Sequence, residues 1–389
     1  MNIVESHYDK DEDKWIEAEY DLDTAPDEVR KRWYQSVCQG EELERVLHPR
    51  NAKDYLLKIR AEAITDNVRI GRLFAHIFRM PEFAGKGIEG LFEDYPYEIV
   101  KKYLNKDDKT KCKKVAGGSL YINTANGEIL QTPFGPVSTF SHTLRYFSKF
   151  ATLALMNFDN RVPMSVRRAA MVIAIRIHLQ TEAPDFEMDP RGIIPKDINK
   201  ELNRIYFYQS VFVAGHELGH YILGHLDDKS VEKRSILQPK FSDNYDPRAY
   251  PVFSIKKRHE LDADIAALNR PVYPEDFYGK LYIATLNWFA ALAIAEAVED
   301  CIFPPDPMKV SLPSAKERYK NILAQARVPK DLDEKYVTEE LPAIIEECSK
   351  EFVEEAQINI DLFERYGSVY LAAPDTEWRG RERIDRVDY

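Results

Sequence analysis

Apolar residues along this chain recur mostly with the period of an α-helix. Between residues 62 and 104 they fall three or four positions apart, and the same spacing returns from 143 to 179. A further helix is predicted from Ile198 to Leu223, where Gly224 supplies a C-terminal cap. The pattern therefore predicts a mostly helical protein.

One segment carries a clear β-strand signal. SLYINTANGEILQT, at 119–132, places Asn126-Gly127 between two alternating or β-branched runs, which predicts a β-hairpin. Residues 227–257 are polar and charged and contain prolines, so we expect them to form a long irregular excursion. The expected fold class is α+β, mostly helical, with a small β-hairpin or sheet.

The composition excludes several classes of protein. With 54 Lys and Arg against 65 Asp and Glu, the net charge is −11, which disfavours a general nucleic-acid binder. The four cysteines form no CxxC pair, so neither a disulfide scaffold nor a cysteine-ligated zinc module is expected. The N-terminus lacks the features of a secretory signal, and polar residues interrupt the apolar run from Leu281 to Val298. We therefore expect a soluble cytoplasmic protein with no membrane or nucleic-acid partner, in which that run is a core helix.

The residues that carry chemistry concentrate in VFVAGHELGHYILGH, where His216, Glu217 and His220 form an HExxH motif. Histidines four residues apart project from one face of a helix, so both imidazoles can bind a single metal ion. The glutamate beside the first histidine can accept a proton from metal-bound water. Uncharged residues flank the motif, which indicates a buried helix rather than a charged surface helix.

A hydrolytic zinc site needs a third protein ligand and an open position for water. Downstream, KKRHELDADIAAL offers Glu260 and Asp264 one helical turn apart. Glu260 is the expected third ligand, and Asp264 is expected to accept a hydrogen bond from the outward nitrogen of a ligand histidine. The alternative interpretation of this segment is an acidic, solvated helix start.

Other third ligands are less favourable. The pattern HExxHxxGxxH is excluded, because Leu223 and Leu226 stand where it requires glycine and histidine. His225 lies about 140° around the helix from the second histidine, so we expect it to end the helix or to support a ligand. His259 and Asp262 are expected to point away from the acidic stripe and are weaker candidates.

These motifs resemble those of the gluzincin metallopeptidases, which combine HExxH with ExxxD. The order beyond the ligands is most similar to the soluble phage-exclusion peptidases of the Lit type and, more distantly, to the HtpX-type enzymes. An apolar, alanine-rich segment follows ExxxD, and SLPSAKERYKNIL then matches the family's His-Pro-x-Ala-x-Glu-Arg pattern at Pro313, Ala315, Glu317 and Arg318. The similarity covers residues 205–325, roughly a third of the chain.

The resemblance implies a zincin-like metallopeptidase core with an active-site helix at 116–330. An N-terminal helical region, 1–115, would precede it, and a C-terminal helical extension, 331–389, would follow. Leu312 departs from the family pattern, because it replaces the histidine before the proline. If that histidine helps to bind the oxyanion, this chain needs another donor. The candidates are Arg318, His259, Tyr245, Tyr250 and Tyr278.

The expected activity is hydrolysis of a peptide bond by Zn²⁺ bound to the two histidines and Glu260. Glu217 is expected to take a proton from the polarised water and to return one to the leaving amine. Arg318 is a candidate to stabilise the oxyanion. Zincin-type peptidases hold their substrate along an edge strand, for which the hairpin at 119–132 is the sequence candidate. The alternative is a hairpin that only caps the helices.

Three functions fit these residues. Similarity to the Lit-type peptidases implies cleavage of a cytosolic protein in bacterial defence against phage. A second interpretation is a regulatory protease, like the ImmA-type enzymes that cleave repressors of mobile elements. A third is a metal-stabilised interaction protein whose catalysis has decayed, for which Leu312 is the only hint. The intact Glu217 argues against the third, because a decayed site has no reason to keep its general base.

Overall fold

The computed structural model describes residues 2–9, 14–21, 24–83, 86–122, 126–225, 231–234, 250–253, 257–304, 312–374 and 376–380. They form a mostly helical molecule with a small mixed sheet, which confirms the α+β expectation. The two longest helices are α9 (Lys196–Ile222) and α11 (Glu275–Ile302). The other helices are α1 (Asp27–Tyr34), α2 (Gly40–Leu47), α3 (Ala52–Asp66), α4 (Val68–Ile77), α5 (Tyr95–Tyr103), α6 (Lys106–Cys112), α7 (Thr143–Leu155), α8 (Met164–His178), α10 (Lys257–Asn269), α12 (Ala315–Gln325), α13 (Leu341–Ile358) and α14 (Asp361–Glu364).

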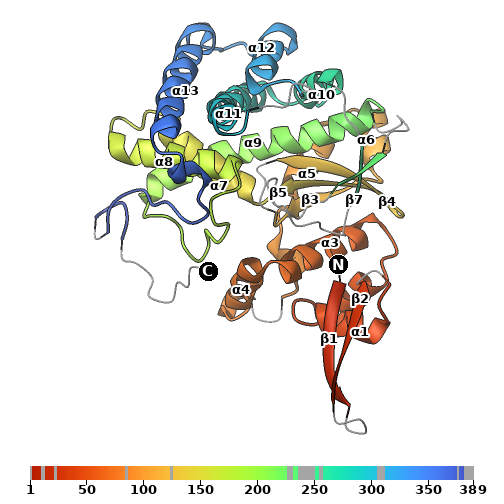
Figure 1. Cartoon of the computed structure of the whole chain (residues 1–389). Coiled ribbons are helices and arrows are strands. Elements are labelled where there is room, and N and C mark those ends of the chain that lie inside the picture. The colour runs from red at the N-terminus through yellow and green to blue at the C-terminus, as the bar shows by residue number, and fades with distance from the viewer. Residues whose placement is uncertain are drawn as a thin grey trace.

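A five-stranded sheet lies beside α9 (Figure 1). β3 runs parallel to β5, and every other neighbouring pair in this sheet is antiparallel. The strand order is β3 (Ala116–Leu120), β5 (Gly135–Ser141), β4 (Gly127–Thr132), β7 (Tyr250–Phe253) and β6 (Val231–Arg234).

The hairpin predicted at 119–132 is wrong in its pairing. In the described residues, β3 and β4 each pair with β5 rather than with each other. The hairpin turn lies between Thr132 and Gly135, where Gly135 has a φ of +114° and the Phe134 N–H donates to Thr132 Oγ1 at 3.2 Å. Gly127 is the first residue of β4, so the Asn-Gly pair marks the start of a strand and not a turn.

We expected residues 227–257 to be irregular throughout. This is wrong at two places, because short strands form at 231–234 and 250–253. β6 and β7 pair antiparallel, from Val231 opposite Phe253 to Arg234 opposite Tyr250. The rest of this segment up to residue 256 lies outside the described residues. Because β7 also pairs with β4, β4 lies inside the sheet and is not the free edge strand that we expected.

Helices cover both faces of the sheet (Figure 1). On one face, Leu56 and Ile59 of α3 pack with Leu130 and Val137 of the sheet. On the other face, Phe140 of β5 joins the main hydrophobic core, which includes α5, α7 and α9. The sheet therefore lies between α3 on one face and α9 on the other, and α7, α10 and α11 also contact α9.

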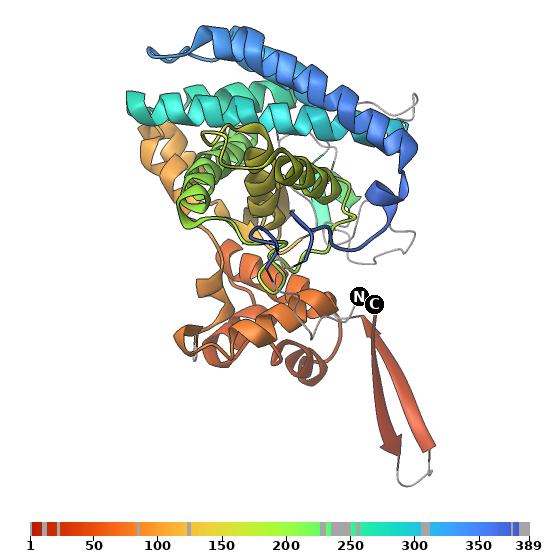
Figure 2. The ribbon, with the colours of Figure 1, turned by 90° about the vertical axis from the view of Figure 1, so that its left-hand side faces the viewer.

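α11 lies at the centre of the helical layer that covers α9 (Figures 1 and 2), in contact with α9, α12 and α13. Among the described residues it is the one helix long and apolar enough to cross a membrane, yet 72% of its most apolar window is buried inside the molecule. This is the environment of a core helix, as expected for the run from Leu281 to Val298, and it is consistent with a soluble protein.

The hydrophobic cores divide the chain near residue 95. Helices α1 to α4 gather around Tyr34, Leu57 and Phe74 in a core of their own. The main core begins with α5 and extends to Phe363 and Trp378 in the C-terminal segment. β1 (Asn2–Asp9) and β2 (Lys14–Asp21) form a separate antiparallel pair that projects beyond the N-terminal helices (Figure 2).

Candidate metal centre

The candidate metal centre lies where α9 and α10 pack closely together. Gly215 and Gly219 of α9 face α10, and a methyl group added at either position would crowd its backbone. At Gly219 it would lie 3.1 Å from the Ala263 carbonyl oxygen, and at Gly215 it would lie 3.2 Å from Ala267 Cβ. Each of these glycines comes immediately before one histidine of the HExxH motif. The close approach of the two helices therefore brings α10 directly against the motif.

Three side chains converge there in a geometry that suits one metal ion. The Nε2 atoms of His216 and His220 lie 3.0 Å apart. Glu260 Oε2 is 3.4 Å from His216 Nε2, and Glu260 Oε1 is 3.6 Å from His220 Nε2. With bonds of about 2.0–2.1 Å, two ligands of a tetrahedral zinc lie roughly 3.3 Å apart, so these spacings bracket the required value. The buried His216, His220 and Glu260 group could therefore hold a metal ion.

Asp264 fixes the orientation of the first histidine. His216 Nδ1 lies 2.9 Å from Asp264 Oδ1, which leaves Nε2 facing the second histidine and Glu260. Burial disfavours a charged imidazole, but hydrogen bonds to Asp264 and Glu260 outweigh it and raise the pKa of His216 to about 10. The metal-free centre thus holds a proton where a metal would bind.

Arg318 completes this arrangement from α12, whose start is fixed by a capping box between Ser314 and Glu317. Its guanidinium donates to both oxygens of Asp264, from Nε at 2.8 Å and from Nη2 at 2.6 Å. Its Nη1 also lies 3.3 Å from Glu260 Oε2. Burial would raise the pKa of Asp264, but Arg318 and His216 together hold it below the ordinary value. This geometry places Arg318 behind the ligands, where it positions them.

Glu217 is almost fully buried, with 4% of its surface exposed. Burial raises the pKa of its carboxyl to about 8, and the nearby carboxylates of Glu260 and Glu128 act in the same direction. A methyl group added at Gly127 would lie 2.8 Å from Glu217 Oε1. The start of β4 therefore needs a glycine because it packs directly against this carboxylate.

His225 lies against the second histidine, because the chain reverses beyond the helix. Gly224 has a φ of +73°, and the His225 N–H donates to the His220 carbonyl oxygen at 3.0 Å. The Nδ1 atoms of His225 and His220 lie 3.0 Å apart, so one of them carries the proton that the other accepts. The ring of His225 stacks on His259 with centroids 4.2 Å apart. His225 thus supports a ligand, from a position that helical geometry does not give.

The five candidate donors for the oxyanion differ in whether their polar atoms are already bonded. Arg318 is engaged by Asp264 and Glu260, and the Tyr278 hydroxyl donates to the Arg327 carbonyl oxygen. Tyr245 and the side chain of Tyr250 lie outside the described residues. Leu312 is 56% exposed ahead of α12. His259 Nδ1 is buried without a hydrogen-bond partner in the described part of the chain.

Sequence reasoning missed the glycines that shape the centre. Gly215 and Gly219 allow the two helices to meet, and Gly127 leaves room for the Glu217 carboxylate. The available signal was a small residue immediately before each ligand histidine, which indicates close helix packing.

Comparison of the chain with family models, with curated proteins and with solved structures gave no match. The function is therefore inferred from the residues of the candidate centre. The structure itself shows a buried group of two histidines and a glutamate that could hold a metal ion, with a buried glutamate beside it.

Proposed function

We propose that the protein is a zinc-dependent endopeptidase of the gluzincin type. The observation that carries this proposal is the combination of three converging ligands with a carboxylate on His216 Nδ1. A metal-ligating histidine commonly donates its other nitrogen to a carboxylate, which fixes the ring and raises its basicity. A pair of histidines close together for another reason would not need Asp264 fully buried behind one of them.

Zinc is the metal that best fits these donors. Two imidazoles and one carboxylate are a known ligand set of catalytic zinc, which keeps a fourth position for water. Sites for magnesium or calcium use oxygen donors throughout. A zinc ion bound here would supply a Lewis acid for the scissile carbonyl and a water of lowered pKa.

Glu217 is the proposed general base and acid. Its carboxyl is buried beside the candidate ligands, where it can reach a water bound to the metal. It would take the proton from the attacking water and deliver one to the leaving amine. Arg318 is now proposed as a positioning residue for Asp264 and Glu260, because its guanidinium donates to Asp264 and forms an ion pair with Glu260. The donor for the oxyanion stays unassigned.

The proposed substrate is a cytosolic protein, and the resemblance to phage-exclusion peptidases makes anti-phage defence the first role to test. A regulatory protease that cleaves a repressor would use the same centre and would differ only in its target. The decayed interaction protein is disfavoured, because Glu217 is intact and a decayed site has no reason to keep its general base.

The test compares new protein N-termini in cells that produce the wild type or the Glu217→Gln variant, with and without phage. We expect cleavage by the wild type and a loss of about 10²–10⁴-fold in the variant. The zinc content, measured by metal analysis, should stay near one per chain in both. Glu354→Gln, at an exposed position on α13, is the matched control and should cleave normally. Identical N-termini in all cells, or purified protein without zinc, would overturn the proposal.

A further inference from the structure

β1 and β2, which together we call the ribbon, form a sheet of their own. Their register runs from Asn2 opposite Asp21 to Asp9 opposite Lys14. Figures 1 and 2 both show the ribbon projecting away from the rest of the molecule. A two-stranded ribbon is at best marginally stable by itself in water. We therefore expect it to pack on a surface of another molecule.

The ribbon carries an excess of negative charge. Its two strands contain five acidic residues and one lysine. The lysine is opposite Asp9, and no other acidic residue of the ribbon has a basic residue opposite it. Residues two apart in a strand share a face, so Glu17, Glu19 and Asp21 form an acidic row with steps of about 6.8 Å. Trp15 precedes the acids in the same row.

The exposed face of α4 carries the opposite charge. Arg72, His76 and Arg79 are exposed and follow one another at helical spacing along α4 and the turn after it. α4 itself contains no acidic residue. Val68 lies one turn before Arg72 and is 75% exposed. This face is therefore a row of one apolar residue followed by two arginines and a histidine.

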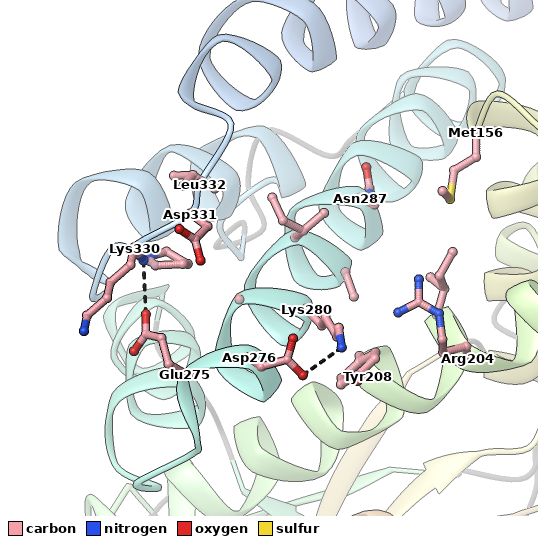
Figure 3. A pocket seen from close by; sticks show the side chains of 15 residues that line it. Met156, Arg204, Tyr208, Glu275, Asp276, Lys280, Asn287, Lys330, Asp331 and Leu332 are labelled. Carbon is pink, nitrogen blue, oxygen red and sulfur yellow. Dashed lines mark hydrogen bonds and ion pairs between the residues drawn. The ribbon is translucent and has the colours of Figure 1, made fainter.

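The groove of about 460 Å³ between α9, α11 and the turn at 329–332 lacks such an excess of charge (Figure 3). Its Lys280 ammonium donates to Asp276 at 2.8 Å, and its Glu275 carboxylate accepts from the Lys330 N–H at 3.1 Å. Because opposite charges are paired there, the groove does not select the charge of a partner. The ribbon and the face of α4 each carry one predominant sign and do select it.

The rows on β2 and α4 match in order as well as in charge. With β2 parallel to α4, Trp15 lies opposite Val68, and the three acids that follow lie opposite the arginines and the histidine. The steps are about 6.8 Å along the strand and about 4.5–6 Å along the helix, a mismatch that long arginine side chains can absorb. Within one chain the ribbon projects away from α4 (Figure 1). The matching contact is therefore one between two copies.

We propose that two copies of this chain form a symmetric dimer in which each ribbon packs its acidic row against α4 of the other copy. A two-fold axis repeats the contact, so both ribbons and both α4 faces are covered. The contact of Trp15 with Val68 contributes apolar burial, and the charged rows select the partner and its orientation. The dimer uses neither the metal ligands nor Glu217, so it does not rest on the proposed protease activity.

The experiment measures the mass of the full chain by analytical ultracentrifugation as its concentration is raised to about 100 μM. We expect a monomer–dimer equilibrium that weakens at least tenfold between about 50 and 500 mM salt, because salt screens the charged rows. The ribbon variant Glu17→Lys/Glu19→Lys should weaken the dimer at least tenfold at low salt. The α4 variant Arg72→Glu/Arg79→Glu should do the same, because like charges then face each other.

The matched control for the α4 variant is Lys316→Glu/Lys320→Glu, which makes the same change of charge at exposed positions of α12. It should dimerise as the wild type does. If Arg72→Glu/Arg79→Glu does not fold, Arg79→Glu alone replaces it, because this residue lies beyond the last residue of α4.

A mixture of the ribbon variant and the α4 variant gives the decisive result. In a mixed dimer both contacts again join opposite charges, so its affinity should return to within about threefold of the wild type. A wild type that is monomeric at about 100 μM would overturn the proposal, and so would charge-reversed variants that dimerise as tightly as the wild type. Two monomeric variants that do not associate when mixed would also overturn it, because the ribbon and α4 would then not be partners.

Discussion

The Asp264 carboxylate accepts hydrogen bonds from two partners, the Nδ1 of His216 and the guanidinium of Arg318. It is completely buried, so neither partner can be replaced by water. This explains why a residue that does not reach the metal position can control both ligand orientation and local charge.

Asp264→Asn is therefore expected to weaken zinc binding by about 10- to 100-fold, because the ring of His216 loses its carboxylate partner. The variant should also be less stable, since Arg318 keeps a buried charge without its main counter-ion. Competition with a chromophoric chelator measures the first effect and thermal unfolding the second. Unchanged zinc affinity in a folded variant would show that Asp264 does not orient His216.

The metal-free centre should lose stability as the pH rises. Glu217 has a folded pKa of about 8 against 4.5 ordinarily, mainly through burial, and His216 has about 10 against 6.5. Both values are raised, so each contribution is fully present below the ordinary pKa and lost as the pH rises through the folded pKa. Glu217 loses its contribution between about pH 4.5 and 8 and His216 between about pH 6.5 and 10, so both contributions fall together between about pH 6.5 and 8.

We expect the melting temperature of chelator-treated protein to fall across this window, with a smaller fall in Glu217→Gln. Zinc must displace the proton from His216, so its apparent affinity should rise by about tenfold per pH unit. Both are measured in buffers of constant ionic strength. A zinc affinity independent of pH would mean that the centre is not protonated without metal.

At the scale of elements, the contact between α9 and α10 decides whether the ligands meet. Neither helix carries a complete site, because two ligands lie on one and the third lies on the other. The distance between the helix axes is set by Gly215 and Gly219, where no side chain separates the backbones.

Gly219→Ala should weaken metal binding without removing any ligand, because the new methyl group would push α10 away. Its effect on stability combines overpacking, about 1–3 kcal/mol, with a gain in helix propensity of about 1 kcal/mol. Metal affinity is thus the decisive measurement. Gly279→Ala is the control, since the same change meets only ordinary contact there. Equal metal affinity in both variants would contradict this role for Gly219.

The whole molecule is held together by a buried ion network that anchors the C-terminal segment. Glu182 accepts from Arg176 Nε and from Arg191 Nε, each at 2.7 Å, and all three side chains are buried. Glu182 Oε1 also accepts from the Val369 N–H at 3.0 Å. The non-helical segment after α14 is thereby joined to Arg176 of α8, a helix of the main core.

Glu182→Gln should destabilise the protein by about 3–5 kcal/mol, because two buried guanidinium groups lose their shared counter-ion. Glu351→Gln is the matched control, because its ion pair with Arg168 is nearly half exposed and contributes at most about 1 kcal/mol. Urea unfolding measures both. If the two variants were equally stable, the network would not anchor the C-terminal segment.

The sequence alone determined the local features of this protein. Helical periodicity predicted α9 and its end at Gly224, and the spacing of His216, Glu217 and His220 follows from the helical repeat. It also singled out Glu260 and Asp264, because the residue types suited to zinc and to its supporting hydrogen bonds are few. These features depend on residues close together in the chain.

Contacts between residues far apart in the chain were decided only by the tertiary structure. The strand partners of β4, the close contact of Gly127 with Glu217 and the place of Arg318 behind Asp264 all join separate segments. An Asn-Gly pair favours a hairpin turn, but the long-range pairing of the strands overrides this local preference here. From sequence alone, an arginine could donate either to the oxyanion or to the residues around the metal ligands. Packing decides between these roles, because it determines which acceptors the guanidinium reaches. Local spacing therefore set the chemistry that is possible, and packing set which atoms meet.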